Sequence, residues 1–278
     1  MTIMSRETRR TVSVRSIERT RVSALAGCWY DCRMTPDQWL EALRTGIAAV
    51  VATPPGHLDR EAPSCPGWTA RDVVAHLGGV HRWAVGVVTG QKIPYADVDP
   101  EAPTGETVIG WYADRADSLV AALTSNYLDA PTKSPFGERP VRFWYRRQAN
   151  EVAVHRWDIE YAYRGWDAAP IDETLAADGI SEWSELFTPR RIGRDGGTPE
   201  DLRGARILLH ANDTDGSWLL RADADGIGIV DDDAEPDATI TASTSDLLLA
   251  LWHRVPLSHL TVDGDVARVE RVLDLVRI

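Results

Sequence analysis

Cysteine is scarce in this chain of 278 residues, which contains only Cys28, Cys32 and Cys65. An odd number of cysteines at these spacings completes neither a disulfide framework nor the paired cysteines of a structural zinc site. Cys28 and Cys32 alone would make half of a metal site or a redox pair, and without a second pair we expect neither. The N-terminus also lacks the apolar core of a secretory signal, so we expect a reducing, cytoplasmic location.

Long apolar runs and lysine are also rare. No run approaches the roughly 20 apolar residues needed to span a bilayer. The mean hydropathy is −0.26, so we expect a soluble protein without a membrane partner. Lys92 and Lys133 are the only lysines among 30 basic residues, and the net charge is −12 at pH 7. Nucleic-acid binding requires clustered lysine and arginine, so the charge balance favours small-molecule partners.

The chain is long enough for two domains, and its apolar content of 44% can fill two cores. Residues 1–33 carry seven arginines against three acidic residues and show no apolar periodicity. We interpret them as a disordered extension or a mis-assigned translation start. Residues 34–190 are expected to form a helical domain and residues 200–278 a smaller one, because a segment rich in glycine and charge separates them.

The first domain has the apolar periodicity of helices. Thr35 and Thr69 are typical N-cap residues, and each precedes a segment whose apolar side chains recur at helical spacing. Further periodic segments cover residues 104–125 and 141–165. Four helices of this length predict a bundle, and facing side chains in a bundle core are a usual place for a metal site.

The second domain has a different pattern. A helical connector is expected over residues 172–187, followed by the glycine-rich boundary segment. Four short alternating runs then predict antiparallel strands. They are ARILLHA, SWLLRAD, GIGIVDD and ATITAS. Two helices are expected at 245–254 and 266–277, with a short strand and turn between them. The fold class is therefore α+β with two domains.

Three residues of the predicted bundle could hold a metal ion. Glu151 and His155 are four residues apart, so a helix places them on one face, and His76 lies in another predicted helix. Two imidazoles and one carboxylate leave coordination positions open, as in catalytic zinc and non-haem iron sites. Gly79 follows His76 by one turn and would leave room beside an ion for water or substrate. An ordinary helical ion pair would explain Glu151 and His155 without a metal.

The surroundings of the pair favour the metal. Its helix is apolar on several sides, and a carboxylate buried there needs a partner because an unpaired buried charge is costly. Asp158 follows His155 by three residues and could be the acceptor that fixes an imidazole. A surface salt bridge of Asp158 with Arg156 or Arg164 is the alternative.

Two segments, APSCPGWTARDVVAHLGGVHRW and NEVAVHRWDIEYA, resemble the mycothiol-dependent maleylpyruvate isomerase family. The order and separation of CPGWT, the histidine helix and the later E-x-x-x-H-R-W-D carry the likeness. The resemblance implies a DinB-like four-helix bundle in which His76, Glu151 and His155 bind a divalent metal, usually zinc. Residues from about 204, with DGSWLL, SDLLLALWHR and TVDGD, look like the family's sterol-carrier-like C-terminal domain.

The resemblance also implies a chemistry. A low-molecular-weight thiol, mycothiol, would add to a cis double bond and leave after rotation, and Arg254 would clamp a substrate carboxylate. The expected function is a metal-dependent, mycothiol-using isomerase or thiol transferase acting on a small substrate. One alternative is a zinc-dependent hydrolase on the same bundle, with Asp158 or another acid as the base. The other is a non-catalytic metal-binding or regulatory module.

Overall fold

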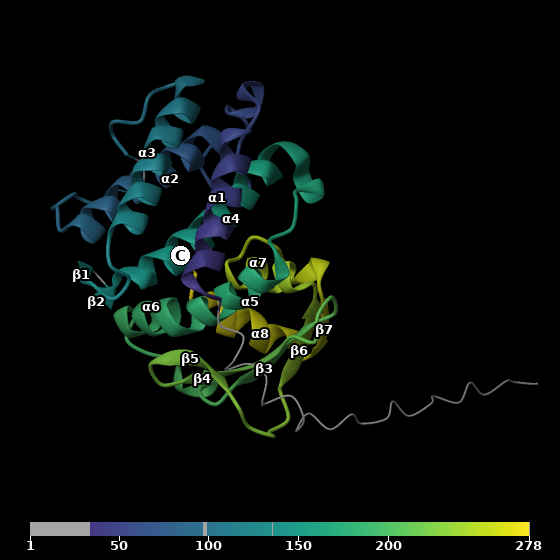
Figure 1. Ribbon diagram of the computed structural model, residues 1–278. Coiled ribbons are helices and arrows are strands. Elements are labelled where there is room, and N and C mark those ends of the chain that lie inside the picture. The colour runs from purple at the N-terminus through teal and green to yellow at the C-terminus, as the bar shows by residue number, and fades with distance from the viewer. Residues whose placement is uncertain (1–33, 97–98, 135, 278) are drawn as a thin grey trace, which may run out of the picture. The chain divides into compact units, whose positions relative to one another are not determined.

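The computed structural model describes residues 34–96, 99–134 and 136–277 (Figure 1). The predictions for residues 1–33, including Cys28 and Cys32, lie outside the described residues.

The helical half is built from long helices that lie within a few residues of their predicted positions. They are α1 (Pro36–Val51), α2 (Ala70–Thr89), α3 (Thr107–Ser125) and α4 (Val141–Arg164). α1 packs mainly against α4, and α2 packs against both α3 and α4 (Figure 1). Among the described residues, no helix is both long and apolar enough to cross a lipid bilayer.

Capping boxes begin two of these helices. The Thr35 hydroxyl accepts a hydrogen bond from the Gln38 backbone N–H, and the Gln38 side chain accepts one from the Thr35 backbone N–H at 2.8 Å. Thr69 and Asp72 make the same reciprocal pair at the start of α2. Each box satisfies two N–H groups that a helix start would otherwise leave unpaired. The second box fixes where α2 begins and so where His76 lies along it.

Two glycines in α2 allow its neighbours to approach closely. A Cβ atom at Gly78 would lie 2.1 Å from the Trp111 ring of α3. A Cβ atom at Gly79 would lie 3.0 Å from the Cβ atom of Asp99. The prediction that Gly79 leaves room for water or substrate is therefore wrong, because the segment before α3 fills that space.

A short hairpin that was not predicted connects α3 to α4. Its strands are β1 (Pro131–Ser134) and β2 (Gly137–Pro140), which pair antiparallel. The indole N–H of Trp144 donates a hydrogen bond to the Thr132 hydroxyl at 2.8 Å, and this bond ties the hairpin to the first turn of α4.

The connector is longer than predicted. It consists of η3 (Gly165–Asp167), α5 (Glu173–Glu182), a π-helical turn η4 (Trp183–Phe187) and α6 (Thr188–Arg194). The last helix therefore extends into the segment predicted as a glycine-rich boundary. The hydroxyls of Ser184 and Thr188 both donate to the Ile227 carbonyl, so the connector is held on the sheet that follows.

The C-terminal half contains a five-stranded sheet in the order β5-β4-β3-β6-β7 within the described residues. The strands are β3 (Arg206–Ala211), β4 (Ser217–Asp223), β5 (Gly226–Val230), β6 (Ala238–Ala242) and β7 (Thr261–Gly264). Most neighbours are antiparallel as predicted, but β3 and β6 pair parallel. After β5, which lies at one edge of the sheet, the chain crosses to the other side of β3. The next strand, β6, therefore runs parallel to β3 and not antiparallel as predicted.

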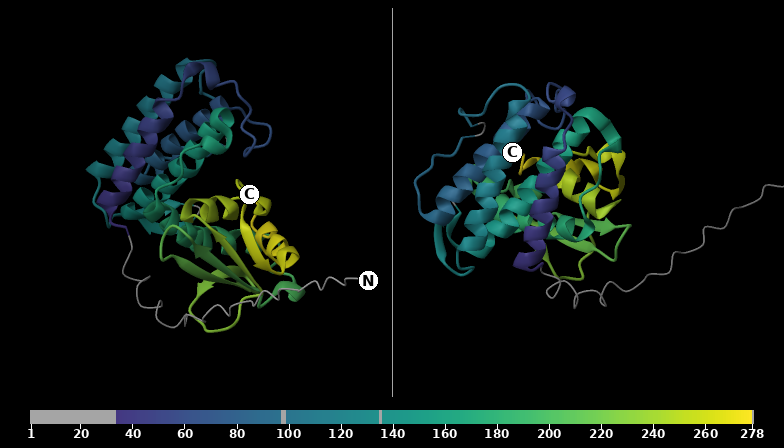
Figure 2. Two further views of the ribbon diagram at one scale, coloured as in Figure 1. Left: turned by 90° about the vertical axis from the view of Figure 1, so that its right-hand side faces the viewer. Right: turned by 45° about the horizontal axis from the view of Figure 1, so that its top comes forward.

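Short helices complete this half. They are α7 (Thr244–Leu251), α8 (Val266–Asp274), η5 (Glu200–Leu202) and η6 (Leu257–His259), and η2 (Pro55–His57) lies in the helical half. α7 packs against α5, and Figure 2 shows the strands lying to one side of the long helices. The architecture is α+β, with a helical N-terminal part and a sheet-containing C-terminal part.

The end of α7 differs from the prediction of a helix to residue 254. The helix stops at Leu251, and His253 adopts the left-handed conformation with φ of 58°. The backbone N–H of Arg254 donates to the Leu249 carbonyl, and that of His253 donates to the Ala250 carbonyl. These two bonds form a Schellman motif, which turns the chain sharply. The turn directs Arg254 back toward α4.

Candidate metal centre

The three residues proposed as ligands lie together between α2 and α4. The Nε2 atom of His76 is 3.1 Å from Oε1 of Glu151, and the Nε2 atom of His155 is 3.6 Å from the same oxygen. All three potential ligand atoms lie within 4.8 Å of one another. The spacing of Glu151 and His155 by one helical turn and the packing of α2 on α4 produce this convergence.

The centre is largely buried. His76 is 6% exposed, and its ring lies 5.2 Å from the ring of Trp68, which immediately precedes the cap of α2. The imidazoles of His76 and His155 meet edge to face with their centroids 4.8 Å apart. Water is thus excluded from most of the surface of the three side chains.

The ionisation states suit a cation. Burial alone would raise the pKa of Glu151, but the Arg147 guanidinium and the two neighbouring imidazoles outweigh it and hold that pKa well below its usual range. Burial lowers the pKa of His155 despite the nearby carboxylates. The centre therefore offers an ionised carboxylate and a neutral imidazole, and metal binding requires these forms. The donor set fits a divalent ion of the zinc type.

Asp158 orients one of the imidazoles. Its Oδ2 atom lies 2.9 Å from Nδ1 of His155, so Nδ1 carries the proton and the lone pair of Nε2 faces Glu151. The alternative salt bridges are not formed, because Arg156 pairs with Glu160 and Arg164 lies over the ring of Tyr163.

Asp158 is also held from the C-terminal half. The Nε and Nη2 atoms of Arg254 donate to its two carboxylate oxygens, each at 3.2 Å. The Asp158 side chain is fully buried. Burial would raise its pKa, but Arg254 and His155 together outweigh burial and hold the pKa below the usual range. The structure therefore brings Arg254 to the centre, where it binds Asp158.

Sequence analysis assigned no role to Cys65, which the structure places in this cluster. Its Sγ atom lies 3.3 Å from Oδ2 of Asp158 and 3.9 Å from Nη2 of Arg254. Burial and the Asp158 charge raise the pKa of the thiol to about 12, so it is a neutral hydrogen-bond donor. The CPGWT segment before α2 was the available signal, but the contact depends on the path of a loop.

Cys65, His155 and Asp158 form a second set of donors within 4.8 Å of one another. The guanidinium of Arg254 already supplies a positive charge at this set. The Cys65 thiol is also neutral, whereas metal binding requires a thiolate, and Arg254 binds both oxygens of Asp158. The set of His76, Glu151 and His155 is therefore the better candidate metal centre.

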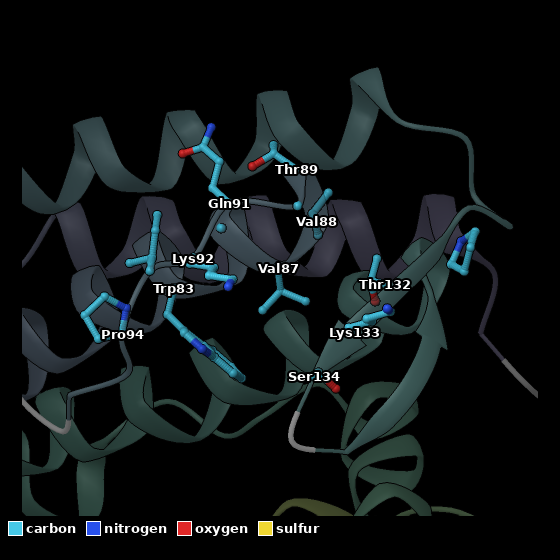
Figure 3. A pocket seen from close by; sticks show the side chains of 14 residues that line it. Trp83, Val87, Val88, Thr89, Gln91, Lys92, Pro94, Thr132, Lys133 and Ser134 are labelled. Atoms are coloured by element: carbon cyan, nitrogen blue, oxygen red, sulfur yellow. The ribbon is translucent and has the colours of Figure 1, made fainter.

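A separate cavity of about 950 Å³ lies at the C-terminal end of α2 and beside β1 (Figure 3). Its lining includes Trp83 and both lysines, Lys92 and Lys133, but none of the candidate ligands. Trp83 follows His76 by seven residues on α2, which is about 10 Å along a helix. The cavity is thus distinct from the candidate metal centre.

Comparison with known families accounts for both halves. Residues 39–160 match the mycothiol maleylpyruvate isomerase N-terminal domain, and residues 174–271 match the C-terminal domain of the same family. The chain belongs to the mycothiol maleylpyruvate isomerase family. No curated protein matches the chain in sequence.

Two solved structures of the mycothiol-dependent maleylpyruvate isomerase, one of them a point mutant, are similar to the chain. Their TM-scores are 0.59 and 0.60, with 16% and 15% sequence identity. Each likeness covers 86% of this chain and 96% of the solved one. At this identity the likeness shows the shared fold. The division into domains at 34–190 and 200–278 stays a prediction.

Proposed function

We propose that this family member is a metal-dependent, mycothiol-using isomerase or thiol transferase acting on a small, carboxylate-bearing substrate. The observation that carries the proposal is the convergence of His76, Glu151 and His155, with the His155 tautomer set by Asp158. The isomerase named in the solved relatives uses mycothiol. We extend that dependence to this chain as part of the proposal.

The proposed ligands are Nε2 of His76, Oε1 of Glu151 and Nε2 of His155. A bound zinc ion would lower the pKa of a thiol beside it and polarise a substrate carbonyl. Asp158 keeps the proton on Nδ1 of His155, so Nε2 stays available as a donor. Burial of the three side chains excludes water that would compete with a thiol or substrate.

Arg254 provides charge for a carboxylate. Its Nη1 atom donates to the Trp252 carbonyl at 2.8 Å, while Nε and Nη2 bind Asp158. Each terminal nitrogen of a guanidinium carries two hydrogens. The second hydrogen on Nη2 faces Sγ of Cys65 at 3.9 Å. One hydrogen on Nη1 remains beyond these bonds, and we assign it to a substrate carboxylate.

The hydrolase alternative lacks a suitable base in Asp158. That carboxylate accepts hydrogen bonds from Arg254 and Cys65, and its lowered pKa makes it a poor proton acceptor. The remaining alternative, a non-catalytic metal-binding module, differs from the proposed enzyme in turnover alone.

The free thiol of Cys65 suits a reducing compartment, and we place the reaction in the cytoplasm.

The test is thiol dependence. Zinc-loaded protein is assayed for cis to trans isomerisation of maleylpyruvate with mycothiol, with a thiol lacking the sugar portion, and with no thiol. We expect turnover that requires mycothiol. In the Arg254→Met variant we expect kcat/KM to fall strongly, mainly because KM rises. Equal rates with and without thiol would contradict the proposal, and zinc binding without turnover would favour the non-catalytic module.

A further inference from the structure

The two oxygens of Glu151 have different neighbours. Oε1 faces the Nε2 atoms of both candidate histidine ligands, at 3.1 and 3.6 Å. Oε2 instead accepts a hydrogen bond from Nη2 of Arg147, which lies one turn earlier on α4. Oε1 is therefore the oxygen that faces the two imidazoles, within hydrogen-bond distance of His76, and Oε2 is the oxygen that Arg147 holds.

Arg147 is itself held in place. Its Nη1 atom donates to Oε2 of Glu182 at 2.5 Å, and its guanidinium lies 5.0 Å from the ring centroid of Phe187. Arg147 is 7% exposed and Glu182 is 1% exposed. Among the described residues, the other oxygen of Glu182 has no hydrogen-bond partner, so Glu182 depends mainly on Arg147 for a partner to its charge. Swinging Arg147 away from Glu151 would leave buried charges unpaired, which is costly.

We propose that Arg147, fixed by Glu182, is a positioning residue that makes Glu151 bind a metal ion through Oε1 alone. The inference rests on the proposed function, because it requires the metal centre. A carboxylate can otherwise chelate with both oxygens, as larger oxygen-preferring ions favour. Blocking Oε2 keeps the coordination number low, and coordination positions remain open for a thiol or a substrate.

The neighbouring residue Arg146 provides a matched control. It is also largely buried and also binds acidic groups of the connector, at 3.0 Å to Asp178 and 2.7 Å to Glu185. In the part of the chain that the structure describes, the hydrogen bonds of its side chain go to Asp178 and Glu185 and none goes to Glu151. Arg146 thus ties α4 to the connector in a similar way without touching the centre.

The experiment compares metal coordination in the full-length protein and in the double variant Arg147→Met with Glu182→Gln. Changing both partners together avoids leaving Glu182 as an orphaned buried charge, and the added metal ion is the partner of Glu151. Cobalt is substituted for zinc, and its visible absorption reports coordination number. The affinities for zinc and manganese are measured by competition with a chelator. Circular dichroism confirms folding.

We expect the visible cobalt bands of the double variant to be weaker than those of the wild type, as is typical of a higher coordination number. The reason is that the freed Oε2 atom would also bind the ion. The ratio of zinc to manganese affinity should fall by about tenfold or more, the range of effects from partners of metal ligands. Arg146→Met should keep the wild-type spectrum and ratio. Arg147→Lys retains the buried charge and should shift both readouts partly, since a lysine cannot form the same two bonds.

Two failures are distinguishable. Wild-type protein that binds neither zinc nor cobalt would overturn the proposed function and this inference together. Wild-type protein that binds both metals, while the double variant and Arg147→Lys keep its cobalt spectrum and affinity ratio, would overturn this inference alone. If the double variant does not fold, Arg147→Lys decides the matter by the same readouts.

Discussion

Arg254 binds both carboxylate oxygens of Asp158 at 3.2 Å, although the two residues are 96 positions apart in the chain. This contact joins the sheet-containing half to the helix that carries two of the candidate ligands. Through the bond between Asp158 and His155, it connects the C-terminal half to the candidate metal centre.

Replacing Arg254 with methionine should destabilise the protein. The change leaves the fully buried Asp158 without its main partner, and breaking such a pair typically costs about 3 to 5 kcal/mol. Urea unfolding of the metal-free protein measures the loss. Arg221→Met is the control, because its pair with Asp223 is more exposed and should contribute little. Equal stability of wild type and Arg254→Met would contradict the assigned contact.

Replacing Asp158 with asparagine should weaken metal binding. Asparagine keeps the shape but removes the charge that holds the proton on Nδ1 of His155. Zinc affinity should fall by roughly 10 to 100-fold, as for other partners of metal-ligating histidines. Competition with a chromophoric chelator measures it. Asp178→Asn, which alters the contact with Arg146, should leave zinc affinity nearly unchanged.

Cys65 should react slowly with an alkylating reagent in the native protein. Its pKa is raised from 9.0 to about 12 by burial and Asp158, so the thiolate fraction near pH 8 falls about a thousandfold. Iodoacetamide labelling of a Cys28→Ser and Cys32→Ser variant isolates this thiol. The rate should rise steeply in urea, and rapid labelling of the folded protein would rule out the buried, neutral thiol.

His81 should make the protein less stable in acid. It is fully buried against Gln148 and Tyr112, and burial lowers its pKa from 6.5 to about 4. The unfolded chain binds this proton at a higher pH than the folded protein does. The contribution of neutral His81 to the free energy of unfolding is therefore fully present above pH 6.5, and it declines by about 3 kcal/mol as the pH falls toward 4. In metal-free protein, His81→Gln should flatten this decline, while the exposed His210→Gln should not. Parallel pH profiles for wild type and His81→Gln would refute the assignment.

Much of the centre could be predicted from sequence, because its geometry is local. Helical periodicity places Glu151, His155 and Asp158 on α4, and the capped start of α2 fixes the position of His76. Most helix and strand positions followed from the same periodicity, but the hairpin of β1 and β2 and the helix α6 did not.

The contacts that complete the centre could not be predicted from local pattern. Cys65 reaches Asp158 through the path of a loop, and Glu182 reaches Arg147 through the packing of α5. The space beside Gly79 is filled by a residue 20 positions later in the chain. The parallel pairing of β3 with β6 depends on how the chain crosses the sheet, and the alternation of apolar and polar residues in a strand does not indicate this path.

If His76, Glu151 and His155 hold a metal ion, the zinc content of the protein depends on both imidazoles. Zinc content per chain is measured for the purified wild type, His76→Ala, His155→Ala and the exposed-residue control His210→Ala. We predict one zinc ion per chain in the wild type and in the control, and loss of that ion in both ligand variants, because they remove converging Nε2 donors. Unchanged zinc content in both ligand variants would contradict it.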